Sequence, residues 1–342
     1  MPTATRDTPR TAPRAEMAPG GVAVAVGVAD AATGAAVVLD PLAREHPQAV
    51  ARPAAHRPVA LVTGGARRIG RAIAQALAEG GFDIALHYRQ SEADAEAAAT
   101  ELRALGGRVV TLGADLDDAD AARALVGRAA AALGRVDAVI NNASRFEYDR
   151  PGDFQPALLQ ALLAANTAAP ILLAEALAAQ VAAQPPLAAG TDGGRVAVPG
   201  SAPDGATGAS RPAITPCVVN LLDQKLANPN PDYLSYTLTK AALAHATTLL
   251  AQALAPAVRV CGVSPGITLV SGPMNDAEFG TAHGMSALGR SSTPEDVARA
   301  VRFLLESPAI TGVDLLVDGG QHLTAQPRDV LFLARDAAGP KP

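Results

Sequence analysis

Tyr236 and Lys240 are the residues of this sequence whose types and spacing point most directly to proton chemistry. They stand four positions apart, so on a helix both side chains lie on one face. The 342-residue chain contains four tyrosines and three lysines, and chance predicts roughly 0.04 pairs at this spacing. A phenol titrates near pH ~10, and a nearby ammonium favours the phenolate and lowers that pKa. The pair predicts a general acid, Tyr236, tuned by Lys240; an exposed tyrosine beside a surface lysine is the structural alternative.

A glycine-rich segment, Thr63–Gly70, follows an apolar run and precedes a helical pattern. In a strand–turn–helix unit, glycines let the backbone approach a pyrophosphate, and the helix N-terminus supplies N–H groups and partial positive charge. A tight turn without a ligand is the alternative, and the position between strand and helix favours a dinucleotide. The residues predicted to contact it here are Gly64, Arg67, Arg68, Ile69 and Gly70.

The segment after the second apolar run indicates which dinucleotide binds. An acidic residue usually holds the ribose of NAD at this place, but residues 87–91 (HYRQS) contain no carboxylate. Arg89 and Ser91, with Arg67 from the turn, offer charge-assisted hydrogen bonds to a 2′-phosphate. Three ordinary surface side chains are the alternative. We predict NADPH rather than NADH as the cofactor.

The motifs together resemble those of the short-chain dehydrogenase/reductase family. They occur in the family's order and spacing as Thr63–Gly70, Asn141-Asn142-Ala143, Tyr236-x3-Lys240 and Ser264-Pro265-Gly266. The resemblance covers about residues 58–323, apart from an insertion. It implies a nicotinamide cofactor, a proton donor at Tyr236, and a Lys240 that also holds the nicotinamide ribose.

Two departures from the usual family pattern are shared with its pteridine reductase branch. Arg68 replaces the middle glycine of the turn, and Asp223, thirteen residues before Tyr236, replaces the catalytic serine. The branch is also similar in its HY-x-x-S and NNAS-x-F segments, which are residues 87–91 and 141–146 here. The resemblance therefore implies hydride transfer to a ring C=N bond of dihydrobiopterin, dihydromonapterin or dihydrofolate, with Asp223, Tyr236 and Lys240 catalytic.

A pterin is a flat heteroaromatic ring, and the predicted substrate contacts suit one. Phe146 offers a stacking surface, and Arg68 can bond the pterin oxygen or a cofactor phosphate. Ser144 is expected at the pterin edge, and the Asp223 carboxylate suits N–H donors. A core aromatic at Phe146 and a turn cap at Asp223 are the structural alternatives.

Further assignments rest on the resemblance alone. Asn166, in Asn166-x3-Pro170, matches the family's asparagine that supports a water relay to the active-site lysine. Residues 268–289 match the family's substrate lid and are expected to form a mobile apolar loop. The family also implies a homotetramer, built on the apolar helices around 156–182 and 233–254. The remaining expected cofactor contacts are His87, Tyr88, Asp115, Leu116, Asn142, Ala143, Ser144, Lys240, Pro265 and Gly266.

Two other functions compete with this interpretation. One is a reductase of a different carbonyl, such as an oxoacyl thioester or another ketone, against which Asp223 and Arg68 argue. The other is a non-enzymatic NADP-binding sensor, which the complete set of Asp223, Tyr236, Lys240 and Asn166 makes less favourable. No metal site is predicted, because the sequence lacks metal-ligand spacing.

The elements that must position these residues alternate along the chain. The predicted strands are 58–63, 82–88, 108–112, 136–141, 217–222, 258–263 and 313–317. The predicted helices are 71–79, 91–105 (opened by a capping-box-like Ser91-x-x-Asp94), 118–133, 156–182, 233–254 and one starting near Pro294. Strict alternation of this kind predicts an α/β fold: one Rossmann-type, doubly wound parallel sheet of about seven strands with helices on both faces.

Length and composition bound the rest. Residues 1–57 are predicted to be a disordered or weakly structured extension, about 184–213 a flexible Gly/Pro-rich insertion, and 338–342 a tail. The intervening 58–337 then form one reductase domain. A net charge of −5 argues against nucleic-acid and membrane partners. Two distant cysteines and no uninterrupted apolar run of about 18 residues favour a cytoplasmic protein.

Overall fold

The strands form one parallel sheet, in the computed structural model, which describes residues 57–183 and 215–337. The seven strands are β1 (Val59–Val62), β2 (Asp83–Tyr88), β3 (Val109–Gly113), β4 (Ala138–Asn141), β5 (Cys217–Leu221), β6 (Arg259–Pro265) and β7 (Asp314–Val317). Their order is β3-β2-β1-β4-β5-β6-β7, and every pairing is parallel. The order reverses between β1 and β4, where α/β sheets open a ligand crevice beyond their carboxyl ends. The predicted fold class is confirmed.

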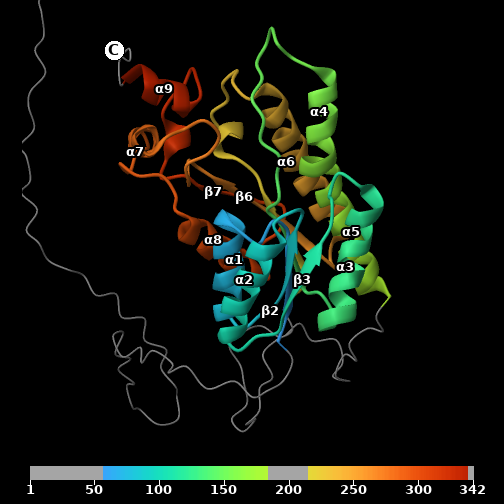
Figure 1. Ribbon diagram of the computed structural model, residues 1–342. Coiled ribbons are helices and arrows are strands. Elements are labelled where there is room, and N and C mark those ends of the chain that lie inside the picture. The colour runs from blue at the N-terminus through green and yellow to red at the C-terminus, as the bar shows by residue number, and fades with distance from the viewer. Residues whose placement is uncertain (1–56, 184–214, 338–342) are drawn as a thin grey trace, which may run out of the picture. The chain divides into compact units, whose positions relative to one another are not determined.

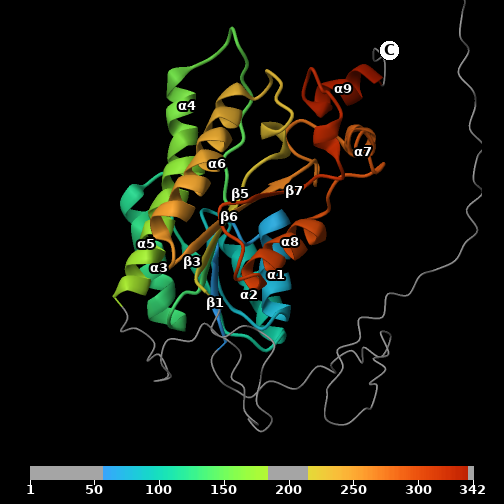
Figure 2. The ribbon, with the colours of Figure 1, turned by 180° about the vertical axis from the view of Figure 1, so that it is seen from behind.

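Helices cover both faces of the sheet (Figures 1 and 2), and alternating strand residues pack against them. Ala60 and Val62 face a core with α1 (Arg68–Glu79), α2 (Glu92–Ala104) and α8 (Pro294–Glu306). Val59 and Leu61 face a second core with α3 (Ala119–Leu133), α5 (Ala169–Ala182) and α6 (Leu234–Leu254). Burial on both faces explains why the strands are continuous apolar runs.

Two helix starts differ from the prediction. Helix α1 begins at Arg68 rather than Arg71, with Arg68 itself at φ 53°. The capping box at Ser91 and Asp94 is wrong, because Ser91 makes no side-chain cap and Asp94 forms an ion pair with Arg67. The start of α8 behaves as expected: Pro294 is in its first turn, and Thr293 caps it.

The predicted long helix over 156–182 is interrupted. A π-helical turn, Ala164–Ala168, separates α4 (Pro156–Leu163) from α5. Pro170 has no N–H, so the carbonyl of Asn166 receives no hydrogen bond from the residue four positions on. By length and composition this 27-residue stretch could cross a membrane, although five charged or polar positions interrupt its apolar run. In the fold, however, Leu173 and Leu177 are fully buried between the sheet and its neighbouring helices.

The expected lid, 268–289, contains a helix rather than a mobile loop alone. Helix α7 (Asp276–Gly284) is fixed by a capping box in which Asn275 and Glu278 bond each other's backbone N–H groups. Its buried Ala282 packs with Leu331 of α9 (Val330–Ala337), above the sheet. The extension before Arg57, the insertion and the tail lie outside the described residues, so those predictions stay as they are.

Candidate active site

Helix α6 carries Tyr236 and Lys240, and a buried carboxylate fixes its first turn. Tyr233, just before the helix, has φ 55°, which turns the chain into the helix. The Asp149 carboxylate accepts hydrogen bonds from the backbone N–H of Ser235, at 2.8 Å, and from the Ser235 hydroxyl. A negative charge is favourable at a helix N-terminus, so Asp149 both satisfies and orients the turn before Tyr236.

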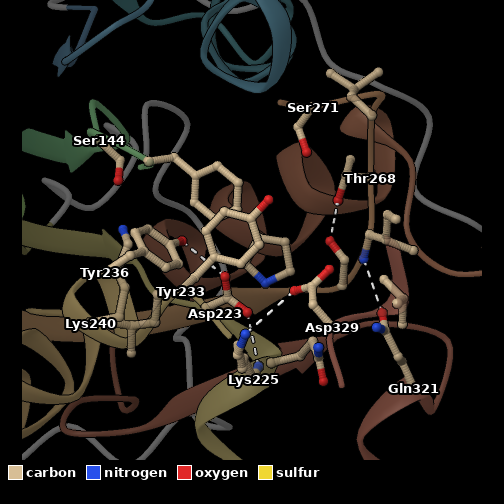
Figure 3. A pocket seen from close by; sticks show the side chains of 18 of the residues that line it. Ser144, Asp223, Lys225, Tyr233, Tyr236, Lys240, Thr268, Ser271, Gln321 and Asp329 are labelled. Atoms are coloured by element: carbon tan, nitrogen blue, oxygen red, sulfur yellow. Dashed lines mark hydrogen bonds and ion pairs between the residues drawn. The ribbon is translucent and has the colours of Figure 1, made fainter. Parts of the chain in front are cut away.

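The end of β5 brings Asp223 against the tyrosine (Figure 3). The Tyr236 hydroxyl donates to Asp223 Oδ2 at 2.9 Å. Asp223 Oδ1 accepts from the backbone N–H of Lys225 at 2.9 Å, so the carboxylate also caps the short 3₁₀ turn Gln224–Leu226. Lys240 Nζ donates to the Leu221 carbonyl at 2.7 Å and lies 5.8 Å from the centre of the Tyr236 ring.

Burial controls the protonation of this group. Tyr236 and Lys240 are 7% and 3% exposed. Burial raises the pKa of Asp223, although the Lys225 N–H and the Tyr236 hydroxyl oppose it. Burial lowers the pKa of Lys240 to about 8.

The expected lowering of the tyrosine pKa is wrong for the protein alone. Burial, and then the Asp223 charge and hydrogen bond, raise the pKa of Tyr236 well above its usual value. The Lys240 ammonium donates a hydrogen bond to the Leu221 carbonyl and does not offset this rise in the pKa of Tyr236. Tyr236 is therefore held as a neutral phenol, the form that can give up a proton.

A cavity of about 290 Å³ opens over this group. The predicted site residues that line it are Arg68, Ile69, Asn142, Ser144, Phe146, Asp223, Tyr236, Lys240, Pro265 and Gly266. Thr268, Ser271 and Met274 from the lid segment line the other side. The structure thus brings together residues from the start of α1, the ends of β4, β5 and β6, helix α6 and the lid segment.

Phe146 does not offer a free ring on both sides. It stacks on Tyr233, with ring centres 4.2 Å apart and planes 18° from parallel, and contacts Tyr236 edge-on at 4.7 Å. The Phe146 side chain is nevertheless 41% exposed at the cavity. Phe146, Tyr233 and Tyr236 therefore form an aromatic surface beside Asp223.

Arg68 and Ser144 have protein partners. Arg68 donates to the carbonyl of Val270 in the lid segment at 2.9 Å, which links the glycine-rich turn to the lid. The Ser144 hydroxyl donates to Asn166 Oδ1 at 3.2 Å. Both side chains still line the cavity, as expected for substrate contacts.

Asn166 lies behind the cavity rather than in it. It is 1% exposed, and its amide bonds both backbone groups of Arg145 and the hydroxyl of Thr239, the neighbour of Lys240. The side chain therefore positions the loop after β4 against α6. The Asn166 side chain forms no hydrogen bond with Lys240 among those described, so the expected water relay between the two stays a prediction.

A second cavity, of about 440 Å³, extends from the first along the start of α1. It shares Arg68, Ile69, Asn142 and Ser144 with the first cavity. Its lining also includes the remaining predicted cofactor contacts, namely Gly64, Arg67, Gly70, His87, Tyr88, Arg89, Ser91, Asp115, Leu116 and Ala143. Helix α1 has no side-chain cap and no acidic residue in its first turn. Its N-terminal N–H groups thus carry uncompensated positive character, which fits a phosphate.

His87 and Asn142 hold the glycine-rich turn in place. Gly64 N–H donates to His87 Nδ1 at 3.2 Å, and His87 Nε2 donates to the Ala114 carbonyl at 3.1 Å. Burial lowers the pKa of His87, consistent with this neutral form. The Asn142 amide donates to the carbonyls of Thr63 and Gly64. Each of these two residues thus shapes the second cavity through the backbone around it.

The residues expected at a 2′-phosphate are at one end of the second cavity. Arg67 is paired with Asp94, and Arg89 with Asp115 at 3.2 Å. All four of these side chains are substantially exposed, so the pairs are weak and exchange easily with a stronger anion. Ser91 stands free of a cap bond beside them.

Comparison with known proteins decides the family. The family model described as short chain dehydrogenase matches residues 58–196, and the one described as enoyl-(acyl carrier protein) reductase matches 218–322. Pteridine reductase 1 of Leishmania tarentolae is 32% identical over 304 residues, covering 78% of this chain and 97% of that protein. The chain belongs to the short-chain dehydrogenase/reductase family.

Other members of this family cover several activities. The structure of FolM alternative dihydrofolate reductase 1 from Brucella canis, complexed with NADP, has a TM-score of 0.67 and 34% identity, and covers 80% of this chain and 96% of that one. The Brucella suis counterpart, also with NADP, has the same TM-score and 35% identity. A 3-oxoacyl-acyl-carrier-protein reductase of Synechocystis is 29% identical over 275 residues, covering 77% of this chain and 96% of that protein.

One part of the site was not predicted from the sequence. Lys225, Tyr233 and Asp329 line the first cavity together with two glutamines, Gln224 and Gln326. Lys225 is 4% exposed, unusual for a lysine. The rarity of lysine, with three in the chain, was a signal that applied to Lys225 as well as to Lys240.

Proposed function

We propose that this oxidoreductase is an NADPH-dependent pteridine reductase that converts a dihydropterin to its tetrahydro form. The observation that carries the proposal is the Asp223 carboxylate bonded to Tyr236 at 2.9 Å on the cavity wall. The usual family pattern has a serine, a neutral hydroxyl, at this place. A pterin, whose ring edge carries N–H and amino donors, is matched by a carboxylate.

The cavity residues supply the proton side of the reaction. When bound, the reduced nicotinamide supplies a hydride. Tyr236, which burial and Asp223 keep as a phenol, donates the proton to the ring nitrogen of the C=N bond. Asp223 orients that phenol and accepts from the pterin, while the Lys240 ammonium stabilises the phenolate that forms. The aromatic surface of Phe146 supports the flat ring.

The second cavity fits NADPH on the chemistry of its own residues. The uncapped start of α1 suits the pyrophosphate, and Arg67, Arg89 and Ser91 suit a 2′-phosphate. Gly70 allows the tight turn that forms the cavity, because a Cβ there would lie 2.2 Å from the Gly64 carbonyl oxygen. The NADP complexes of the two Brucella relatives support this assignment.

The proposal also includes a homotetramer located in the cytoplasm. Exposed Leu238 and Leu249 on α6, which are 45% and 60% exposed, support an interface along that helix. Size-exclusion chromatography with light scattering on the full chain tests this part. A monomer in this measurement would refute the homotetramer and leave the proposed reaction unaffected.

Steady-state kinetics on the purified full chain test the function. We expect oxidation of NADPH with dihydrobiopterin, dihydromonapterin or dihydrofolate, and none with an acetoacetyl thioester. Tyr236→Phe should lower the rate by about 100-fold or more, since it removes the proton donor while leaving the fold intact. Turnover of the thioester but not of any pterin would instead favour the ketoacyl reductase relatives.

A further inference from the structure

The cavity above Tyr236 ends in a polar wall, made of Gln224, Lys225, Gln326 and Asp329. It begins with Gln224, the residue directly after Asp223, so a group projecting from a ring held by Asp223 would lie next to it. Gln224, Lys225 and Gln326 are 7%, 4% and 5% exposed. Figure 3 shows Lys225 paired with Asp329 beside Asp223.

Two amide atoms of the polar wall are buried without a hydrogen-bond partner. They are Gln224 Oε1 and Gln326 Nε2. The other end of the Gln326 amide accepts from Gln321 at 3.4 Å. Native proteins pair nearly all buried polar atoms, because a buried polar atom without a hydrogen-bond partner destabilises the folded state. Their position in the wall of the site indicates that a ligand supplies the missing partners.

Lys225 adds hydrogen-bond donors without adding net charge. Its ammonium donates to the Asp232 carbonyl at 2.5 Å, pairs with Asp329 Oδ2 at 3.4 Å, and lies 5.3 Å from the centre of the Tyr233 ring. An ammonium has three N–H donors, so one remains for a ligand. Asp329 balances the charge, and its other oxygen accepts from Leu331 N–H at 3.1 Å.

The polar wall thus combines donors and acceptors with no excess of either charge. A hydroxyl group both donates and accepts, so it can satisfy an amide oxygen and an ammonium or amide N–H together. An anionic group would satisfy Lys225 but meet the Asp329 carboxylate. An apolar group would leave both glutamine atoms unpaired.

We propose that the polar wall binds the hydroxyl groups of the side chain next to the reducible bond, and so selects hydroxylated dihydropterins. This inference rests on the proposed function and adds the residues that distinguish one pterin from another. Lys225 and Gln224 are specificity residues: they contact the side chain of the substrate and leave the reacting atoms to Tyr236 and Asp223.

Two variants and two substrates test the proposal. 7,8-Dihydrobiopterin carries a hydroxylated side chain, and 6-methyl-7,8-dihydropterin carries none. We expect Lys225→Met and Gln224→Met to lower kcat/KM for dihydrobiopterin by about 10-fold, and to change that for the methyl compound by less than about twofold. Gln75→Met, on the exposed face of α1, is the matched control and should change neither.

A stability measurement guards against a merely structural effect. Gln224→Met removes a buried oxygen that has no protein partner, so its Tm should equal or exceed that of the wild type. If Lys225→Met fails to fold, Gln224→Met alone decides. The proposed role of the polar wall would be overturned if the variants lost kcat/KM equally on both substrates, or if the wild type had equal kcat/KM on both. Either result would leave the pteridine reductase function unaffected. A wild type that reduces neither pterin would overturn the function itself.

Discussion

Lys240 has a measurable consequence for the stability of the fold. It is 3% exposed, and burial lowers its pKa from 10.5 to about 8. The unfolded chain therefore binds a proton that the folded chain has lost over the range from about pH 8 to 10.5. Unfolding then becomes less favourable as pH rises, so Lys240 contributes increasing stability across this range.

The size of the effect follows from the pKa difference. About 2.5 pH units separate the two states, and each is worth about 1.36 kcal/mol, so the charged lysine costs the fold about 3 kcal/mol near neutral pH. Between pH 7 and pH 10, about 2–3 kcal/mol of this cost disappears. Lys240→Met removes the titrating group, so only the wild type should show this gain.

Denaturant unfolding of both proteins at pH 7 and pH 10 measures the difference. The free energy of unfolding of the wild type minus that of Lys240→Met should rise by about 2–3 kcal/mol, and groups common to both cancel. Lys240→Gln should behave like Lys240→Met if charge rather than shape is responsible. A difference that does not change with pH would refute the reasoning that burial depresses this pKa.

Three further predictions follow from the site. Asp223→Asn should lower kcat/KM for dihydropterin by about 10- to 100-fold, because Tyr236 loses a charged acceptor; kinetics within twofold of the wild type would contradict this. Arg89→Gln should raise the ratio of kcat/KM with NADH to that with NADPH by about 10-fold, and an unchanged ratio would remove Arg89 from the 2′-phosphate site. Asp149→Ala should cost about 1–3 kcal/mol in denaturant unfolding, because Ser235 loses both its bonds; an unchanged midpoint would refute its capping role.

The arrangement of the site could be predicted because it depends on local patterns. Continuous apolar runs alternating with helical periodicity are enough to define a parallel sheet. The carboxyl end of β5 and the first turns of α6 then have to meet at the same edge. Asp223 and Tyr236, thirteen residues apart, accordingly lie within hydrogen-bond distance.

The electrostatics could not be predicted, because they depend on burial and on distant partners. The spacing of Tyr236 and Lys240 shows that they share a helix face, but not that both are buried or that Lys240 bonds Leu221. Burial, together with the Asp223 charge, therefore raises the pKa of Tyr236, whereas the sequence predicted that it would be lowered. The pairing of Arg67 with Asp94 likewise joins segments 27 residues apart, with no local signal.

The polar wall escaped prediction for a related reason. Lys225 follows Asp223 by two positions, but its partner Asp329 is 104 residues further along the chain. From the local sequence alone, a lysine two positions after Asp223 is expected to be a solvated side chain. The segment of the chain that returns after β7 brings Asp329 against it.

Deuterium transfer from labelled NADPH shows directly whether this chain reduces a dihydropterin. The full chain is incubated with 7,8-dihydrobiopterin and NADPH deuterated on the transferred position, and the product is analysed by NMR and mass spectrometry. We expect a tetrahydropterin that carries one deuterium on the carbon of the reduced C=N bond, and we expect Tyr236→Phe to form little or none of this product. Unlabelled product, or a labelled alcohol formed only from an acetoacetyl thioester, would contradict this expectation.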